Sequence, residues 1–318
     1  MNISIIIPNY NGEQLLKKNL PKIYDAVSEY KNGRVEIIIP DDPSIDKSSE
    51  VINGFINSIV DKNIIGKTIS NRNVAKSGFG MNVNRGASIA TGDVLILLNS
   101  DVHPHKKFLE PLLKHFEKPD IFAVGCLDES IEENGEVVYR GRGIGKFKKG
   151  FLSHNKGDID QSNTLWVSGG SGAFRKSVWD RLGGFDTIYD PFYWEDIDLS
   201  YQAQKAGFKT VFESKSIVTH EHEQGIVKTQ YTELYVKRIS YRNQFIFIWK
   251  NVTDVSLLIF HIFWLPYHFL KALKDKDWAF YVGFYLALLK LPRIMLTRSS
   301  IHMRAVRSDL EIVRSIQK

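Results

Sequence analysis

Two short polar clusters in the sequence have the residue types that chemistry needs. The first is NSD, in which Asn99 and Asp101 follow the apolar run DVLILL. The second is WEDIDL, in which Glu195 and Asp196 open a predicted helix directly behind three aromatic residues. Carboxylate and amide oxygens select Mg²⁺ or Mn²⁺, and such metals usually bridge to substrate phosphates. The first cluster therefore predicts a metal site, and the second predicts a carboxylate base beside an aromatic wall that could stack on a sugar.

Both clusters also have a purely structural explanation. Asn, Ser and Asp are favoured helix caps and turn formers, so NSD could simply begin the next helix. Acidic residues in a first helical turn are stabilised by the helix dipole, which would account for Glu195, Asp196 and Asp198. The functional reading gains weight because carboxylates also follow another strand, in the segment PDDPSID.

The elements that would position these residues form an alternating pattern. The apolar runs ISIII, VEIII and DVLILL predict strands, and apolar residues recur at helical spacing between them. This alternation predicts a parallel sheet covered by helices on both faces. Ligands of open α/β sheets lie outside the carboxyl ends of the strands. We therefore expect one rim to gather Asp41, Asp42, Asp46, Asn99 and Asp101.

From about Glu129 the alternation fades into a mixed α/β region. The stretch GEVVYRGRGIGKFKKGFLS predicts a Gly-rich hairpin or loop, and SIVTHEH predicts a short strand that carries His220 and His222. Isolated histidines usually lie on the surface, so the sequence by itself favours no metal role for them. No Walker A pattern and no Ser nucleophile elbow occurs.

Composition excludes several classes of protein. A chain of 318 residues that is 43% hydrophobic can bury a full core, so it is not a disordered segment. Cys126 is the single cysteine, which excludes an intrachain disulfide and a thiolate metal cage. Residues 3–7 form an apolar run that has no Lys or Arg before it and stops at Pro8, so no signal peptide is predicted. These features favour a reducing compartment, the cytoplasm.

The basic character of the chain belongs to its last part. Residues 225–318 carry 15 Lys and Arg against 6 Asp and Glu, whereas residues 1–224 carry 27 against 30. The segments 255–270 and 278–291 are apolar and rich in aromatic residues, and both are shorter than the roughly 20 residues of a spanning helix. We expect them to be interfacial helices on an anionic membrane surface. A helical cap on the core and a homodimer interface are the alternatives.

Five segments in a fixed order closely resemble glycosyltransferase family 2. They are SIIIPNYNG, VEIIIPDDPSIDKSSEVI, GFGMNVNRGASIATGDVLILLNSDV, GGSGAFRKSVWDRLGGFD and PFYWEDIDLSYQAQKAGF. The resemblance implies an α/β GT-A fold, with a mostly parallel Rossmann-like sheet, over residues 1–224. Residues 1–128 would bind the nucleotide-sugar and residues 129–224 the acceptor, and residues 225–318 would be a basic amphipathic helical region.

The resemblance also implies roles for individual residues. Asp196 would be the catalytic base with Glu195 beside it, and Asp101 and His220 would hold Mg²⁺ or Mn²⁺. Gly169, Gly170 and Trp194 would lie near the acceptor. The nucleotide-sugar would be bound by Pro8, Tyr10, Asn11, Asp41, Asn84, Asn99 and Ser100.

Some residues depart from the family pattern. Asn99 stands where the first Asp of the Asp-x-Asp metal motif is usual, although related sequences that resemble rhamnosyltransferases also have Asn there. Pro40 and Pro43 stand where Val and Gly are usual, which affects the expected base selectivity.

The function that the resemblance implies is metal-dependent, inverting transfer of a hexosyl or deoxyhexosyl group. The donor would be a UDP- or dTDP-sugar, and the acceptor a hydroxyl of a lipid-linked or cell-surface glycan. The protein would work peripherally on the inner face of the cell membrane. The alternatives are a degenerate, non-catalytic nucleotide-sugar-binding or scaffold protein and, less favoured, a sugar-phosphate nucleotidylyltransferase. Nucleic acid is not an expected partner, because the basic tail lacks a recognisable motif.

Overall fold

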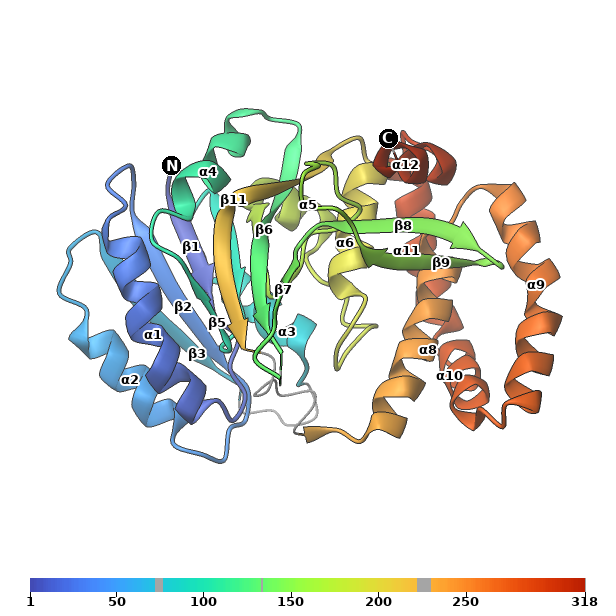
Figure 1. The fold of residues 1–318 in the computed structure, drawn as a ribbon, viewed down its shortest axis with the longest axis horizontal. Coiled ribbons are helices and arrows are strands. Elements are labelled where there is room, and N and C mark those ends of the chain that lie inside the picture. The colour runs from blue at the N-terminus through green and yellow to red at the C-terminus, as the bar shows by residue number, and fades with distance from the viewer. Residues whose placement is uncertain (72–76, 133, 222–229, 318) are drawn as a thin grey trace.

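The computed structural model describes residues 1–71, 77–132, 134–221 and 230–317 (Figure 1). Its strands are β1 (Ile3–Ile6), β2 (Val35–Asp41), β3 (Ile64–Ser70), β4 (Val94–Leu98), β5 (Val102–Pro104), β6 (Ile121–Ile131), β7 (Val137–Arg140), β8 (Gly143–Lys148), β9 (Phe151–Lys156), β10 (Ser171–Arg175) and β11 (Lys209–Glu221). Its helices are α1 (Glu13–Ser28), α2 (Ser48–Ser58), α3 (Phe79–Ser88), α4 (Leu109–Lys114), the 3₁₀ turn η1 (His115–Glu117), α5 (Lys176–Leu182), α6 (Glu195–Lys205), α8 (Glu233–Asn251), α9 (Val255–Lys274), α10 (Trp278–Leu288), α11 (Leu291–Arg304) and α12 (Asp309–Ile316).

One large sheet organises the first two thirds of the chain. Its strand order is β3-β2-β1-β4-β10-β6-β11-β5, with β7 paired to β6. The strands β3, β2, β1 and β4 are mutually parallel, while β10 runs antiparallel between β4 and β6. The prediction of a mostly parallel α/β sheet flanked by helices is therefore confirmed. The antiparallel strands β7 and β10 fall in the half where the alternating pattern fades, and the short β5, antiparallel to β11, follows directly after β4.

The apolar runs of the parallel strands are buried on both faces of the sheet. Ile5 pairs in register with Ile37 and Ile96, and these side chains pack in one core cluster with residues of α1, α2 and α4. The alternate positions, such as Ile6 and Leu97, pack in a second cluster with residues of α3, α5 and α6. Because successive side chains of a strand point to opposite faces, an uninterrupted apolar run requires helices on both sides.

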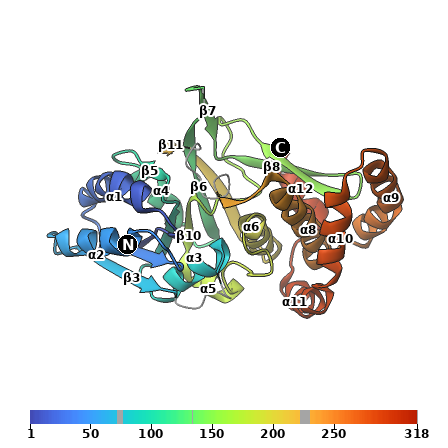
Figure 2. The ribbon, with the colours of Figure 1, turned by 90° about the horizontal axis from the view of Figure 1, so that it is seen from below.

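The last part of the chain builds a third core cluster rather than a detached tail. Phe245, Ile246, Phe247 and Ile248 of α8 are all buried, and they pack with residues of α6, α10, α11, α12 and the β8–β9 hairpin. Four consecutive apolar residues cover all sides of a helical turn, so this part of α8 must be enclosed by other elements. Figures 1 and 2 show these helices at the end of the molecule opposite α1 and α2.

The α9 helix is longer than its apolar stretch predicts. It runs over 20 residues to Lys274, and by length and composition it is the one continuous helix in the described part of the chain that could cross a membrane. The helices α10 and α11 are long and apolar enough to cross a membrane only when they are counted together, as one broken span that is bent by 66°. This is weak evidence for a span, but little of α9 is buried, so its outer side presents apolar residues to solvent.

Candidate active site

A cleft of about 440 Å³ opens at the carboxyl ends of the parallel strands. The α6 N-terminus faces the tips of β1 and β4 across it. Ten of the residues predicted for the site line this cleft: Pro8, Tyr10, Asn99, Ser100, Asp101, Gly169, Gly170, Glu195, Asp196 and His220. The sheet thus brings together segments more than a hundred residues apart in sequence, and the individual roles of these residues stay predictions.

Strand pairing places His220 beside Asp101. His220 on β11 is in register with Val102 of β5, and β5 begins directly after Asp101. The Nε2 atom of His220 lies 3.4 Å from Oδ2 of Asp101, and its Nδ1 lies 3.0 Å from Oδ2 of Asp128. Burial alone would lower the pKa of His220, but Asp101 and Asp128 together raise that pKa to about 10. The ring of His220 is therefore protonated and positively charged between the carboxylates of Asp101 and Asp128.

The arrangement of Asp101 and His220 fits a divalent cation. The raised pKa keeps both ring nitrogens of His220 protonated, so a cation would bind Nε2 by displacing its proton, while Nδ1–H stays directed at Asp128. Such carboxylate–histidine pairs are typical of metal ligands. Among the described residues no group of three or more His, Cys, Asp or Glu could hold a metal. A hard cation bound by one or two protein groups takes its other ligands from water and substrate phosphate.

The wall beside β1 and β2 is made of Asn9 and two aspartates. Asp41 accepts hydrogen bonds from Asn9 Nδ2 at 2.7 Å and from Ser44 Oγ at 2.8 Å, so its carboxylate is directed to the protein. Its neighbour Asp42 lines the cleft. Asn11 lies outside the lining and binds Ile45 N through its side chain. Contact of Asp41 or Asn11 with a base stays a prediction. Asp42 is the aspartate of this pair that lines the cleft, although it too is buried and accepts hydrogen bonds from Asn71 Nδ2 and Gly78 N, both at 3.1 Å.

Glu195 and Asp196 reach the cleft because the chain turns sharply before α6. Tyr193 and Trp194 have φ values of 70° and 79°, in the left-handed region that non-glycine residues rarely adopt. Each such residue costs about 1–3 kcal/mol, and this kind of strain clusters at functional sites. The turn aims the N-terminus of α6, whose dipole stabilises negative charge, at the cleft.

The two carboxylates differ in their surroundings. Asp196 accepts hydrogen bonds from Gly169 N at 3.2 Å and from Ile197 N at 2.7 Å. Burial raises the pKa of Asp196 above its ordinary value despite these bonds. Burial and the neighbouring Asp196 charge raise the pKa of Glu195 well above its ordinary value. The pair therefore favours an ionised, oriented Asp196 beside a protonated Glu195.

A side chain from the C-terminal region holds the strained turn. Asn243 on α8 is fully buried, and its Nδ2 lies 3.1, 2.9 and 2.8 Å from the carbonyl oxygens of Tyr189, Phe192 and Tyr193. Its neighbour Arg242 donates to the carbonyl of Tyr189 at 2.8 Å. Sequence reasoning missed this role, because nothing near Asn243 signals a partner fifty residues away.

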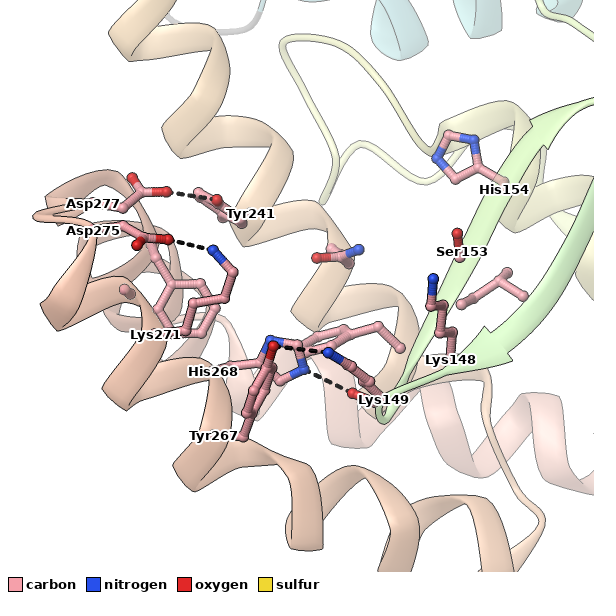
Figure 3. A pocket seen from close by; sticks show the side chains of 15 residues that line it. Lys148, Lys149, Ser153, His154, Tyr241, Tyr267, His268, Lys271, Asp275 and Asp277 are labelled. Carbon is pink, nitrogen blue, oxygen red and sulfur yellow. Dashed lines mark hydrogen bonds and ion pairs between the residues drawn. The ribbon is translucent and has the colours of Figure 1, made fainter.

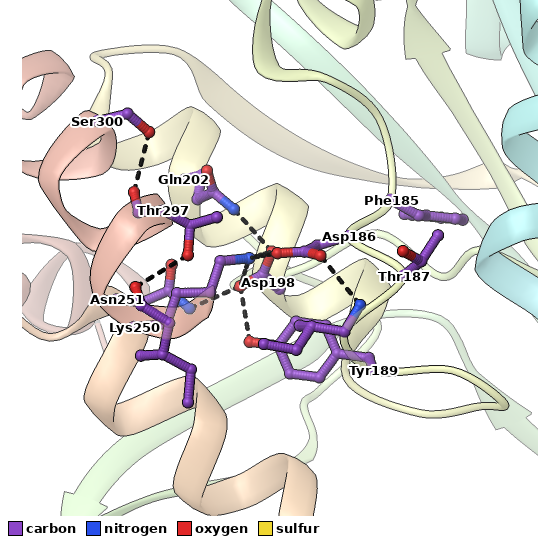
Figure 4. A network of polar contacts seen from close by, with 12 residues as sticks. Phe185, Asp186, Thr187, Tyr189, Asp198, Gln202, Lys250, Asn251, Thr297 and Ser300 are labelled. Atoms are coloured by element: carbon purple, nitrogen blue, oxygen red, sulfur yellow. Dashed lines mark hydrogen bonds and ion pairs between the residues drawn. The ribbon is translucent and has the colours of Figure 1, made fainter. Parts of the chain in front are cut away.

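A buried ionic network ties α6 to α8 beneath the site (Figure 4). Asp198 is fully buried and pairs with Lys250 Nζ at 2.8 Å. It also accepts hydrogen bonds from Tyr189 Oη at 2.8 Å and Asn251 Nδ2 at 2.6 Å. Lys250 pairs in addition with Asp186 at 2.7 Å. This network fixes α6, and with it Glu195 and Asp196, relative to the C-terminal helices.

Other predicted site residues have different positions. A Cβ at Gly170 would lie 2.6 Å from Asn99 Nδ2, so any side chain there would displace the Asn99 amide. The resemblance predicts Asn84 at the nucleotide, but Asn84 does not line the cleft. Its Nδ2 donates to the carbonyl of Phe185 and its Oδ1 accepts from the N–H of the same residue. We predicted Trp194 near the acceptor, but its ring is buried outside the cleft lining.

Several lining residues had no place among the predicted site residues. One of them is Tyr193, whose ring is exposed. The neighbouring Trp194 instead packs against His154 and Phe247 in the third core cluster. Asn82 also lines the cleft, one position before the Val83 that faces the core. The second histidine of the predicted strand, His222, lies outside the described residues.

Comparison with known proteins agrees with this architecture. The model for "Glycosyl transferase family 2" matches residues 4–183, and that for "Glycosyl transferase family group 2" matches residues 94–292. The O-antigen chain rhamnosyltransferase WbaN of Salmonella anatum is 23% identical over 229 residues, which are 70% of this chain and 66% of that protein. The matched segments span from 29% to 66% of the first curated relatives in length.

Solved structures resemble this fold at low sequence identity. Residues 1–349 of Staphylococcus aureus TarS in complex with UDP-GlcNAc superpose with a TM-score of 0.61 at 14% identity, covering 100% of this chain and 90% of that one. GalNAc-T7 with UDP, GalNAc and Mn²⁺ gives a TM-score of 0.61 at 17% identity, covering 80% and 49%. The fold is that of the GT-A class of α/β proteins. The chain belongs to glycosyltransferase family 2.

Proposed function

We propose that the protein transfers a hexosyl or deoxyhexosyl group from a UDP- or dTDP-sugar to a hydroxyl of a lipid-linked or cell-surface glycan, with inversion of the anomeric carbon. The observation that carries the proposal is that one cleft is lined both by Asp101 and His220, whose donors suit a cation, and by the buried carboxylate of Asp196, which suits a base. The solved relatives crystallised with UDP-GlcNAc, or with UDP and Mn²⁺, support a donor in this cleft.

Asp196 has the surroundings that a general base needs. Its raised pKa makes it a stronger proton acceptor than an exposed aspartate, and its two backbone hydrogen bonds fix its orientation. It accepts the proton of the acceptor hydroxyl while that oxygen forms its bond to the anomeric carbon. The bond from this carbon to the diphosphate breaks, and the nucleoside diphosphate leaves with the electron pair. A single displacement of this kind inverts the carbon.

The remaining site residues bind and orient the substrates. Asp101 and His220 would hold Mg²⁺ or Mn²⁺, which when bound neutralises the leaving diphosphate. A protonated Glu195 donates a hydrogen bond instead of competing as a base. Tyr193, which is 44% exposed in the cleft wall, is the aromatic surface available to an acceptor sugar.

We place the enzyme peripherally on the cytoplasmic face of the cell membrane, with α9 as the contact. Its outer side exposes Ile259, Ile262 and Phe263, while Lys271 and Lys274 mark its C-terminal end. Apolar residues with basic neighbours are typical of helices that bind anionic membrane surfaces. A lipid-borne acceptor would be presented at such a surface.

A panel of UDP-, dTDP- and GDP-sugars with Mn²⁺ tests this proposal by thermal shift and by slow donor hydrolysis. We expect one nucleotide to stabilise the protein only with metal present, and we expect Asp101→Asn to abolish that shift. Asp25→Asn, at an exposed aspartate of α1, is the matched control and should leave the shift unchanged. Stabilisation without hydrolysis or transfer would instead indicate the non-catalytic binding protein, and no stabilisation by any donor would refute the proposed donor site.

A further inference from the structure

A second cavity, of about 490 Å³, lies between the turn of the β8–β9 hairpin and the helices α8, α9 and α10 (Figure 3). Its polar lining includes Lys148, Lys149, Gln244, Tyr267 and Lys271. A cavity of this size is within the range of small-molecule sites. None of these residues takes part in the cleft described above.

The hairpin turn is fixed on α9 by two histidines. Lys149 and Gly150 both have positive φ, 48° and 81°, which makes a tight two-residue turn. The ring of His268 donates from Nε2 to the carbonyl of Lys149 at 2.7 Å, and His261 donates from Nδ1 to the carbonyl of Gly150 at 2.8 Å. Burial lowers the pKa of both rings, so both are neutral donors. The lysines of the turn are therefore held at a defined place beside α9.

The carboxylates that line the cavity already have cationic partners. Asp275 pairs with Lys271, one helical turn before it. Asp277 accepts a hydrogen bond from Tyr241 Oη at 2.7 Å and pairs with Lys237 at 2.9 Å. Neither aspartate is left to neutralise the lysines of the hairpin turn.

The hairpin lysines supply an uncompensated positive charge. Neither Lys148 nor Lys149 forms an ion pair within the described part of the chain. Lys149 Nζ donates to Tyr267 Oη at 2.7 Å and lies 4.2 Å from the centre of that ring. Figure 3 shows Lys149, at the hairpin turn, directed to the hydroxyl of Tyr267 on α9. Two ammonium groups and a phenol hydroxyl form a set of donors that suits phosphate oxygens.

The cavity adjoins the exposed apolar side of α9. Phe263 and Leu270, which are 74% and 68% exposed, lie within one turn of Tyr267 along the helix. We propose that the cavity binds the phosphate head group of a membrane lipid, whose hydrocarbon chain lies along this side of α9. Charge complementarity supports this occupant, since the C-terminal region carries 15 basic against 6 acidic residues. The inference rests on the proposed membrane association and not on the donor chemistry.

The test compares short-chain, monomeric phosphatidic acid with short-chain diacylglycerol, which lacks the phosphate, and with inorganic phosphate. Each is titrated calorimetrically into the full chain in the presence of UDP and Mn²⁺, which keeps phosphate out of the donor cleft. Of the three ligands, we expect only phosphatidic acid to bind. We expect Lys148→Gln with Lys149→Asn to weaken it about tenfold or more, because each basic residue near a lipid head group contributes about a factor of five. Asn tolerates the left-handed conformation of position 149, so the turn is preserved.

The matched control is Lys62→Gln with Lys106→Gln, which removes the same charge far from α9 and should leave binding unchanged. An equal loss of phosphatidic acid binding in this control would show that surface lysines attract the lipid by charge wherever they lie. That result would overturn the cavity as the binding site. Equal binding of inorganic phosphate would overturn the lipid as occupant, and equal binding of diacylglycerol would overturn phosphate recognition. Self-association that abolishes lipid binding would assign the face to a second copy of the chain. Donor binding measured on the same samples separates these results from failure of the proposed function.

Discussion

Replacing Asn243 by alanine tests whether the C-terminal helices are part of the catalytic machinery. This side chain lies on α8, outside the cleft, yet it binds the carbonyl oxygens of Phe192 and Tyr193 at 2.9 and 2.8 Å. Those residues form the turn that aims Glu195 and Asp196 at the cleft. We expect Asn243→Ala to loosen this turn and to misplace the base.

The magnitude follows from the contacts that are lost. The carbonyl of Tyr189 keeps its hydrogen bond from Arg242, whereas the carbonyls of Phe192 and Tyr193 lose theirs. Leaving a buried polar group unsatisfied costs about 1–3 kcal/mol, so the free energy of unfolding should fall by about 2–4 kcal/mol. The turn also stores left-handed strain, and a shift of about 1 Å at a catalytic group can lower the rate by about a hundredfold.

The assay measures the free energy of unfolding in urea and the rate of sugar transfer, or of donor hydrolysis, at a temperature at which the variant is folded. The matched control is Leu20→Ala on α1, a buried leucine far from the cleft whose loss costs a similar 2–5 kcal/mol or so. We expect similar unfolding energies for the two variants but a much lower rate for Asn243→Ala. Equal rates in the two variants would refute the positioning role.

Three further predictions concern stability and membrane binding. The pKa of Glu36 is lowered to about 2, because its bonds from Lys67 and from nearby hydroxyl and amide groups outweigh burial, which raises it. The charged form therefore stabilises the fold above the ordinary value of 4.5, and this contribution is lost as the pH falls toward 2. Urea unfolding should show Glu36→Gln to be less stable by about 2 kcal/mol at neutral pH and equal to the parent near pH 2, and a gap independent of pH would contradict this. Lys250→Met leaves the fully buried Asp198 uncompensated, so thermal and urea unfolding should show a loss of about 3–5 kcal/mol, and a loss below about 1 kcal/mol would contradict the network in Figure 4. Phe263→Ser should leave the free energy of unfolding within about 0.5 kcal/mol while weakening co-sedimentation with anionic vesicles, and unchanged co-sedimentation would contradict α9 as the contact.

Local patterns predict the parallel half of the sheet well. Uninterrupted apolar runs such as that of β2 have few alternatives to a strand covered on both faces, and the polar residues that follow them fall on one rim by topology alone. The side on which each polar residue points is harder to predict. Asp41 and Asp42 are adjacent and of one type, yet Asp41 turns to Asn9 while Asp42 lines the cleft.

Contacts between distant segments escape sequence reasoning for a physical reason. The partnership of His220 with Asp101 depends on the register of β11 against β5, and only the family resemblance pointed to it. Nothing in the sequence pointed to Asn243, which reaches a loop fifty residues earlier. Neither leaves a periodic signal. The sequence predicts an end of the helix before Lys271, because the apolar run stops there. The helix α9 in fact continues to Lys274, and Lys271 pairs with Asp275 just beyond that end. Composition predicts where an apolar segment ends, but the backbone hydrogen bonds that define a helix can continue for several residues beyond that point.

The most direct test of the account is the effect of Asp196→Asn on transfer and on donor binding, measured in the same preparation with the donor and metal that stabilise the parent protein. The account predicts that the variant binds the donor as the parent does, because the hydrogen bonds of Asp196 come from Gly169 N and Ile197 N and its replacement leaves the Asp101–His220 pair in place. It also predicts that transfer falls by about 10²–10⁴-fold, the usual contribution of a general base. Transfer within a few-fold of the parent, with donor binding intact, would contradict Asp196 as the base and the catalytic assignment of the cleft.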